Sequence, residues 1–291
     1  MKAPAFGCVV ARTVNEALEA LSQDEDATVI AGGQSLVPLL ALRLAYPTTL
    51  VDLNHVEELR GLSRMPDGGI RIGAMTRQSE LAAWLPLSEL NPLVAAAIPY
   101  IAHESIRNRG TVGGSIAHAD PAAEWPLLAV ALDATIEVVG PEGAHDVSAR
   151  AFFVGPFTTA LPAGHVVRAV RLPPFDPSIG WDLYEVTRRH GDFALAGAIA
   201  LVSVDGDVIA GARITLMGAG GPPIVLTDVG SALEGCDLAS IGDAILDAMP
   251  SKEAFSGDLQ TPPEFRHHLA NVVVRRAVTR AVARWQPGDA A

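Results

Sequence analysis

One stretch decides the fold: Thr111-Val112-Gly113-Gly114-Ser115-Ile116-Ala117-His118-Ala119-Asp120-Pro121-Ala122-Ala123-Glu124-Trp125. A short apolar run leads into a Gly-Gly turn. A helix is expected to begin at Asp120-Pro121, because aspartate caps helices and proline suits their first turn. Adjacent glycines allow positive φ and leave no Cβ in the way of a ligand. Since successive N–H groups in such a turn can converge on an anion, the stretch predicts a phosphate-binding turn.

A stretch nearer the N-terminus repeats this design: Val29-Ile30-Ala31-Gly32-Gly33-Gln34-Ser35-Leu36. An expected strand over 27–31 runs into the Gly-Gly pair, and an expected helix follows over 36–44. Strand, glycine turn and helix start occur in the order that an anion site needs. Either pair alone predicts only an ordinary turn, because glycine turns are common. Together they predict a two-sided grip on a phosphate-containing ligand.

The composition is that of a folded, acidic protein. The 291 residues suffice for two domains or one subdivided domain, and 49% hydrophobic with 19% charged residues exclude a disordered chain. The net charge of −12 argues against a nucleic-acid partner, whose binding needs Lys and Arg at the phosphates. An anionic ligand would therefore be held largely by backbone N–H groups.

Neither a membrane span nor a secretion signal is expected. No apolar run reaches the roughly 18 residues that span a bilayer, and the N-terminus lacks the apolar segment of a signal peptide. Cys8 and Cys236 cannot supply the four ligands of an all-cysteine iron–sulfur or zinc site, and we expect reduced thiols. We therefore expect a cytoplasmic protein without an integral membrane segment.

Two helix starts carry capping signals. Thr13 is expected to cap a helix, with Glu16 reaching back to it as in a capping box. Asn91-Pro92 is expected to open a helix that runs to about residue 102. Thr76 is expected to cap a further helix that ends at Trp84.

Prolines that interrupt regular secondary structure indicate the expected domain boundary. Pro173-Pro174 ends an expected strand over 166–172, and Asp176-Pro177 follows directly. We therefore divide the chain into domains 1–174 and 175–291.

The second domain shows a hairpin followed by helices. Segments 196–204 and 208–217 flank Asp205-Gly206, which predicts a two-residue β-hairpin turn. Helices are expected over 238–249 and 262–284, where apolar residues recur at helical spacing.

Four segments carry a resemblance to a known family. The first is Ala31-Gly32-Gly33-Gln34-Ser35-Leu36-Val37-Pro38-Leu39-Leu40, and the second is Ile106-Arg107-Asn108-Arg109-Gly110 with the opening stretch. The others are Arg188-Arg189-His190-Gly191-Asp192-Phe193-Ala194 and Phe265-Arg266-His267-His268-Leu269. In this order they span nearly the whole chain. The chain resembles the flavin-binding medium subunit of the molybdenum hydroxylases, which include carbon monoxide dehydrogenase and nicotine dehydrogenase. It is also similar to the flavin domain of xanthine dehydrogenase.

The resemblance implies an α+β fold. It implies a two-subdomain FAD-binding unit of the vanillyl-alcohol-oxidase (PCMH) type over 1–174, divided near residue 55. A C-terminal domain over 175–291 is implied to hold a small antiparallel sheet and helices. The family does not use the Rossmann fold, and the chain lacks a Gly-x-Gly-x-x-Gly between its first expected strand and helix.

The resemblance implies a role in electron transfer. FAD is the implied cofactor of this chain, whereas a molybdenum cofactor and 2Fe–2S clusters are implied in a large and a small partner subunit, assembled as a dimer of heterotrimers. FAD would take electrons from the clusters and pass them to a small-molecule acceptor: quinone, NAD or oxygen. Neither a catalytic base nor a metal ligand set is expected here, and the substrate would contact the large subunit.

The resemblance also assigns cofactor-binding residues. The pyrophosphate and adjoining groups would be wrapped by two segments: Ala31, Gly32, Gly33, Gln34, Ser35 and Leu36 in the first, and Thr111, Gly113, Gly114 and Ser115 in the second. Glu124 would accept a hydrogen bond from a ribose or ribityl hydroxyl, although it can equally be a helix-start carboxylate that complements the dipole. Arg107 and Arg109, the cations nearest to the second segment in sequence, could touch a phosphate or be solvated or paired with carboxylates. His118 could bond to the cofactor or to backbone, or be a buried histidine with its hydrogen bonds satisfied.

Three further residues are expected near the flavin ring. Val167 occupies the place where the family brings a backbone or aliphatic group against the ring. Glu185 stands where some members carry lysine, and this reversed charge would disfavour an anionic reduced flavin. Phe193 could stack on the ring or belong to the core.

Two other functions stay open from sequence. A stand-alone flavoprotein oxidase of the same fold would need a substrate pocket with a catalytic base or phenolate-binding groups, and none stands out in the sequence. A non-catalytic assembly or binding subunit would have lost its flavin.

Overall fold

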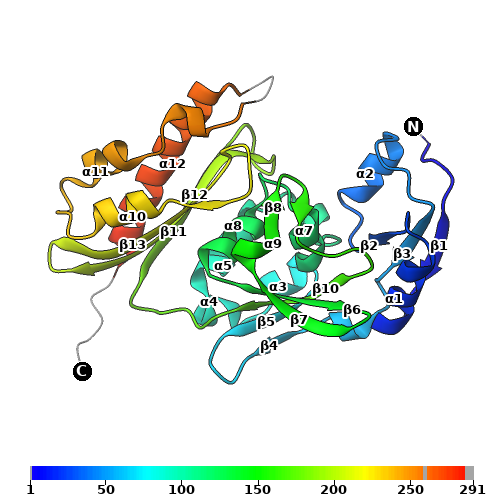
Figure 1. The fold of residues 1–291 in the computed structure, drawn as a ribbon. Helices are drawn as coiled ribbons and strands as arrows, with labels where there is room; N and C mark the ends of the chain where they lie inside the picture. The colour runs from blue at the N-terminus through cyan, green and yellow to red at the C-terminus, as the bar shows by residue number, and fades with distance from the viewer. Residues whose placement is uncertain (1, 258–260, 286–291) are drawn as a thin grey trace.

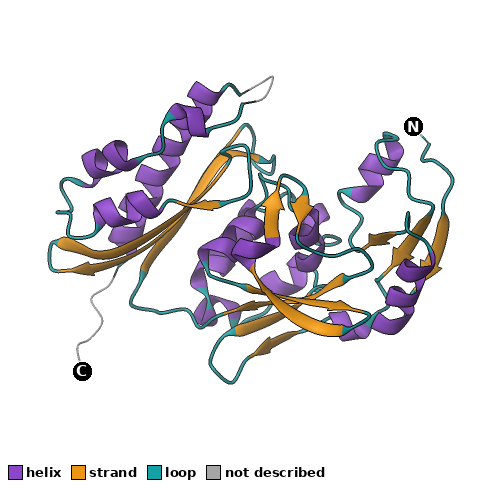
Figure 2. Ribbon diagram, in the orientation of Figure 1, coloured by secondary structure: helices purple, strands orange, loops and turns teal. Residues whose placement is uncertain are grey.

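Three units follow one another along the chain (Figure 1). The structure is a computed structural model and describes residues 2–257 and 261–285. The first unit lies beside the N-terminus, the second forms the centre, and the third packs on the other side of the centre (Figure 1). Their separate sheets, with helices against them, confirm the α+β class (Figure 2).

The first unit is a small parallel sheet with two helices. Its strand order is β1-β3-β2, which a parallel sheet reaches through helical crossovers. Helix α1 buries Ala17 and Leu18 against β3, where Val51 lies in the same apolar cluster. The elements are β1 (Gly7–Val10), α1 (Val14–Gln23), β2 (Thr28–Ile30), α2 (Leu36–Ala41) and β3 (Thr49–Asp52).

The second unit is a five-stranded antiparallel sheet with short helices. The sheet order is β4-β5-β10-β6-β7. Trp125 and Leu128 of α8 are buried in the same cluster as Ile136 of β6, so this helix forms part of the core. Its strands are β4 (Leu62–Arg64), β5 (Ile70–Gly73), β6 (Thr135–Gly140), β7 (Gly143–Ser148) and β10 (Val166–Leu172), and a separate two-stranded sheet is formed by β8 (Phe153–Gly155) and β9 (Thr158–Thr159). The helices are α3 (Gln78–Ala82), α4 (Leu87–Leu90), α5 (Pro92–Ala97), α6 (Glu104–Arg107), α7 (Val112–His118), α8 (Glu124–Ala131) and α9 (Ala149–Phe152), with 3-10 turns at Glu57–Leu59 and Ile98–Tyr100.

The third unit is a four-stranded antiparallel sheet between helices and the second unit. Alternation sorts its side chains: Ala198 and Ala200 of β12 pack toward α12, whereas Ile199 joins the core of the second unit. Met217 of β13 joins that core too, so the two units share apolar side chains. The elements are β11 (Gly180–Thr187), β12 (Ala194–Asp205), β13 (Val208–Met217), β14 (Ile224–Val225), α10 (Thr227–Leu233), α11 (Ile241–Ala248), a 3-10 turn at Lys252–Ala254, and α12 (Pro263–Arg284).

Several sequence predictions are confirmed. Thr13 Oγ1 accepts from the Glu16 N–H at 3.1 Å, although the Glu16 carboxylate accepts from Arg12 N–H, one residue before the expected donor. Asn91 accepts from Val94 N–H at 3.0 Å at the start of α5. The expected hairpin forms, although its two-residue turn is Gly206-Asp207, one residue later than predicted; Gly206 has a φ of +58°.

Other predictions were wrong. The helix expected at Asp120-Pro121 begins only at Glu124, because Asp120 closes a turn by accepting from Ala122 N–H at 2.9 Å. The expected cap Thr76 is displaced by Arg77, which precedes α3. Strand β11 and helix α10 lie in segments for which the sequence predicted no element. The boundaries at residues 174/175 and near 55 stay predictions. Within the described residues, no helix combines the length and apolar content that crossing a membrane requires.

A buried ion pair fixes α12 on β11. Asp182 is only 1% exposed, and Arg284 bonds to its carboxylate while lying over the Trp181 ring, 4.4 Å from the centroid. Replacing Arg284 with glutamine leaves a buried carboxylate poorly paired, so we expect the free energy of unfolding to fall by about 2–4 kcal/mol in urea titrations. Arg280→Gln is the comparison: its Nη1 lies 4.0 Å from the same carboxylate, and its loss should cost less. Equal losses in both variants would contradict this account.

Candidate functional site

The first glycine loop, residues 31–36, offers unpaired backbone donors. Within the described residues, the N–H groups of Gly32, Gly33, Gln34 and Ser35 have no protein acceptor. Gly33 has a φ of +72°, which only glycine adopts without strain. Donors of this kind, between β2 and the start of α2, match the requirement of a phosphate group.

Three of these residues, Gly32, Gly33 and Gln34, line a cleft of about 460 Å³. Asp52, Asn54 and Arg109 come from segments distant in sequence and complete its wall. Arg109 therefore lies at the site, as a contact between Arg109 and the cofactor requires. The full lining is Ile30, Ala31, Gly32, Gly33, Gln34, Val37, Pro38, Asp52, Asn54 and Arg109.

Gly32 is required by a close approach of two backbones. A Cβ built on Gly32 would lie 2.3 Å from the Arg109 carbonyl oxygen and 2.8 Å from Gly110 Cα. No side chain fits there, because real Cβ contacts are never so short. The first glycine loop therefore packs directly on the segment that leads into α7.

The second glycine stretch, residues 111–115, is not the expected turn. It forms the N-terminal end of α7, with Thr111 as the cap. Its donors are taken: Val112 N–H bonds to Thr76, Gly113 N–H to Ala74, and the N–H groups of Gly114 and Ser115 to Thr111. The expected turn with free backbone donors was therefore wrong, whereas the assignment of these residues to the cofactor stays a prediction.

The second glycine stretch has a packing role instead. A Cβ on Gly113 would lie 2.4 Å from the Ala74 Cβ, so glycine lets α7 approach the segment after β5. A Cβ on Gly114 would lie 3.5 Å from the Ala31 Cβ, which places this residue beside the first glycine loop. The two glycine motifs are therefore adjacent, as expected, but only the first presents free donors.

Arg107, His118 and Gln34 have protein partners. Arg107 donates to the carbonyls of Ile101 and Ala102 at 2.9 and 2.7 Å, which favours its structural reading. The His118 ring lies 5.2 Å from the Phe157 ring. Gln34 Nε2 donates to the Gly32 carbonyl at 3.0 Å and so supports the loop from within.

A buried carboxyl group, Glu124, and a half-buried one, Glu185, lie close enough for the charge of Glu185 to affect the pKa of Glu124. Glu124, 5% exposed, stands at the start of α8, and Glu185 lies on β11 beside Gly197. Burial, with smaller contributions from Glu185 and Asp120, raises the pKa of Glu124 to about 8. Burial also raises the pKa of Glu185 to about 7, and its Oε2 is buried with no hydrogen-bond partner among the described residues. The sequence assigned both residues separately and missed this pairing.

The remaining predicted site residues lie at the edges of this region. Val167 is buried in β10, next to a register shift at which the Arg168 carbonyl accepts from Ala74 N–H. Phe193 is 61% exposed at the end of the β11–β12 hairpin, which excludes the core alternative and leaves its ring free to contact a ligand. The same hairpin carries Gly191, whose missing side chain makes room for the His103 ring.

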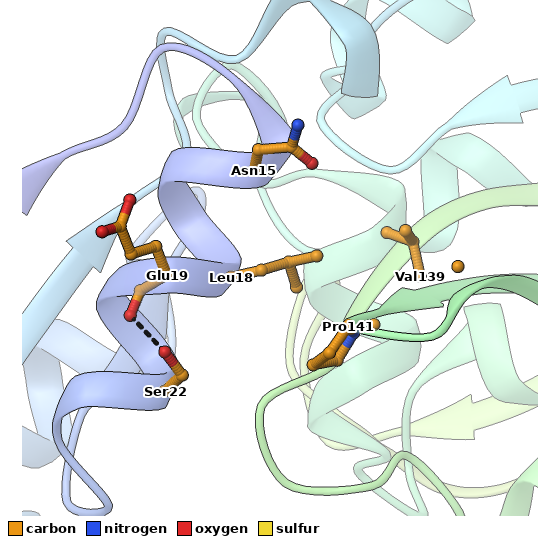
Figure 3. Close-up of a pocket in the computed structure, with 8 residues that line it drawn as sticks. Asn15, Leu18, Glu19, Ser22, Val139 and Pro141 are labelled. Atoms are coloured by element: carbon orange, nitrogen blue, oxygen red, sulfur yellow. Dashed lines mark hydrogen bonds between the residues drawn. The ribbon is translucent and has the colours of Figure 1, made fainter.

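A second cavity, of about 420 Å³, lies away from these residues (Figure 3). It separates α1 from the β6–β7 hairpin, with Leu18 facing Val139 and Pro141 (Figure 3). Ser22 Oγ donates to the Glu19 carbonyl at 2.7 Å. Since Glu19 is its single charged lining residue and no glycine-loop donor reaches it, we assign no chemistry to this cavity. No cluster of His, Cys, Asp or Glu among the described residues could hold a metal ion.

Comparisons with known families agree with this geometry. Residues 4–175 match the family model described as the FAD binding domain in molybdopterin dehydrogenase. Residues 183–281 match the CO dehydrogenase flavoprotein C-terminal domain. The chain belongs to the flavoprotein medium subunits of the molybdenum hydroxylases. It is an FAD-binding subunit of an oxidoreductase complex, and the predicted family is confirmed.

Individual relatives match over almost the whole chain. The nicotine 6-hydroxylase medium subunit of Paenarthrobacter nicotinovorans is 37% identical over 98% of this chain and 100% of its own length. The carbon monoxide dehydrogenase structure from Hydrogenophaga pseudoflava superposes with a TM-score of 0.92 at 33% identity, covering 98% and 100%. Quinoline 2-oxidoreductase from Pseudomonas putida 86 gives 0.91 at 34% identity with the same coverage. These matches confirm the expected fold.

The residues present fit FAD. Its pyrophosphate is an anion, and the first glycine loop supplies backbone donors that lack protein acceptors within the described chain. An acidic protein must bind such an anion through backbone dipoles and a few local cations, and Arg109 at the cleft is one of these.

Proposed function

We propose that this chain is the electron-transfer subunit of a molybdenum-dependent hydroxylase or dehydrogenase, taking electrons from 2Fe–2S clusters of a partner subunit and passing them to an external acceptor. The observation that carries this proposal is the row of free N–H groups from Gly32 to Ser35, of which Gly32, Gly33 and Gln34 line the cleft. When bound, FAD supplies the ability to take up and release two electrons. The chain's own residues bind the cofactor, orient it and set the local charge.

Each predicted site residue has a role in this proposal. The first glycine loop binds the pyrophosphate through its N–H groups, with Gln34 stabilising the loop and Ala31 and Leu36 at its ends. The second glycine stretch (Thr111, Gly113, Gly114, Ser115) places α7 against that loop. Glu124 accepts from a hydroxyl of the cofactor, whereas Val167, Glu185 and Phe193 surround the ring.

The proposal includes an assembly and a location. We expect a large molybdenum-binding subunit and a small iron–sulfur subunit as partners, in a dimer of heterotrimers. Curated relatives carry names such as medium subunit and medium chain, which supports a multi-subunit complex. Cys8 is a free, exposed thiol, which favours the reducing cytoplasm. The same relatives are not stand-alone enzymes by name, so the oxidase alternative loses support.

Flavin reduction separates the remaining alternatives. The purified chain, titrated with FAD, should bind it stoichiometrically and show visible flavin absorbance. Substrate should leave this flavin oxidised in the isolated chain and reduce it when the partner subunits are added. Reduction of the isolated chain would favour the oxidase, and absence of binding at saturating FAD would overturn both flavin functions. The proteins that co-purify with the chain identify the partners directly.

A further inference from the structure

One arginine connects parts of the cleft that are distant in sequence. The Arg77 guanidinium donates to Asn54 Oδ1 and to the Arg109 carbonyl. Asn54 in turn donates from Nδ2 to the Ala31 carbonyl at 3.0 Å. One side chain thus links the beginning of the first glycine loop with the segment that leads into α7.

The backbone around Arg77 holds the same segment. Arg77 forms an isolated antiparallel bridge with Thr111, the cap of α7. Two hydrogen bonds flank this bridge: Gln78 N–H donates to the Gly110 carbonyl at 3.0 Å, and Val112 N–H donates to the Thr76 carbonyl at 3.1 Å. The side chain therefore extends from a backbone position that is already fixed beside α7.

The Arg109 carbonyl is the group against which the first glycine loop packs at Gly32. It is the nearest atom to the place where Gly32 would carry a Cβ. Because Arg77 bonds to this oxygen and, through Asn54, to Ala31, it sets the spacing between the two backbones. The directions of the free N–H groups from Gly32 to Ser35 depend on that spacing.

The charge of Arg77 lies beside two residues of the cleft wall, Asn54 and Arg109. Its two side-chain bonds go to neutral oxygens, and Arg60 and Arg109 lie close enough to lower its pKa, after the larger effect of burial. Arg60 contacts Glu57 and Glu80 at 3.7 and 3.9 Å, so part of this local positive charge is compensated. The charge of Arg77 meets no carboxylate within bonding distance of its guanidinium among the described residues. Cations held together in an acidic protein favour an anion beside them.

We propose that Arg77 is a positioning residue for the cofactor: it clamps the first glycine loop to the α7 segment at the spacing that aims the loop's N–H groups at the pyrophosphate. Its positive charge strengthens the binding of that anion. This inference rests on the proposed function, because FAD supplies the pyrophosphate. It concerns a residue that lies outside every segment carrying the family resemblance.

Two substitutions separate the contribution of the Arg77 hydrogen bonds from that of its positive charge. Arg77→Lys keeps the charge but cannot bridge two acceptors in one plane, whereas Arg77→Gln loses both. Titrating each apo variant with FAD, we expect affinities about 10- to 100-fold weaker than wild type in both cases. The salt dependence of binding should stay as in wild type for Arg77→Lys and become shallower for Arg77→Gln. Arg64→Gln, the same change at an exposed arginine of β4 outside the cleft lining, should bind FAD as wild type does.

A double-mutant cycle tests the relay through Asn54. Asn54→Ala should weaken FAD binding by itself. The double variant Arg77→Gln/Asn54→Ala should bind FAD little more weakly than whichever single variant binds it less tightly, because both substitutions break the same link between Arg77 and Ala31. The positioning role of Arg77 would be contradicted if the losses of FAD affinity in the two single variants added up in the double variant. It would also be contradicted if Arg77→Lys bound FAD with wild-type affinity. Thermal unfolding of each apo variant shows whether it is folded. If Arg77→Gln does not fold, the FAD affinity of Asn54→Ala still tests the proposal. Wild-type protein that fails to bind FAD would instead refute the proposed function.

Discussion

Gly32→Val is expected to abolish FAD binding while leaving the third unit folded. The smallest side chain at Gly32 already meets the Arg109 carbonyl at 2.3 Å and Gly110 Cα at 2.8 Å, and both are backbone atoms that cannot rotate away. The first glycine loop must therefore move off the α7 segment, and its free N–H groups then lose their common direction. We expect FAD titration to show a loss of affinity above about 100-fold, beyond what one lost hydrogen bond explains.

The matched control is the same substitution at a glycine with open surroundings. Gly221 has no atom within 4 Å of its Cβ position, and its backbone does not require positive φ. Gly221→Val should keep wild-type affinity, and both variants should retain the urea transition of the α12 unit. Stoichiometric flavin in Gly32→Val would contradict the assignment of the site to the first glycine loop.

The two Gly-Gly pairs show what sequence can and cannot predict about a site. The sequence predicted that the two motifs lie next to each other and that each needs glycine. In the structure they are adjacent, and a Cβ at Gly32 or Gly113 would clash with neighbouring atoms. Their donors differ: Gly33 adopts positive φ in an open loop, whereas Gly113 lies at the start of α7 and bonds to Ala74. A glycine needed for φ and a glycine needed for packing look identical in a sequence, because the difference lies in residues far along the chain.

Local signals predicted the elements better than their contacts. Asn91-Pro92 and Asp205-Gly206 mark their helix and hairpin correctly, because capping and turn formation involve neighbouring residues only. The helix after Asp120 began later than predicted, since the Asp120 side chain satisfied a nearby N–H in a turn instead. The interaction of Glu124 with Glu185 depends on how the sheet of the third unit packs against α8, and no periodicity in either segment predicts that packing.

The carboxyl pair predicts that the apo protein becomes less stable as pH rises. The pKa of Glu124 is about 8 in the folded protein against 4.5 for an unperturbed glutamate, so between these values the folded state binds more protons than the unfolded state. Stability from this group is complete below pH 4.5 and is lost as pH rises toward 8. Glu185, with a pKa of about 7, acts in the same direction over a narrower range. Because one pKa unit corresponds to about 1.4 kcal/mol, Glu124 alone accounts for at most about 5 kcal/mol of this loss.

Carboxylates in ion pairs act in the opposite direction at lower pH. Hydrogen bonds and ion pairs with Arg213 and Arg150 lower the pKa of Asp133, and Arg71 and Arg171 lower the pKa of Glu137 despite its burial. Stability from these groups is present above their unfolded pKa values and is lost as pH falls through the folded ones. Because that range lies below pH 4.5, the two effects can be measured separately.

Glu124→Gln should therefore remove most of the stability loss on the alkaline side. Glutamine keeps the size of the protonated carboxyl group and cannot ionise, so the buried position stays neutral at all pH values. Comparing urea unfolding of apo protein at about pH 5 and about pH 9, we expect wild type to lose a few kcal/mol and Glu124→Gln to lose much less. Glu89→Gln, at an exposed position of α4, should follow wild type. An equal loss in wild type and Glu124→Gln would show that Glu124 does not hold its proton in the folded state.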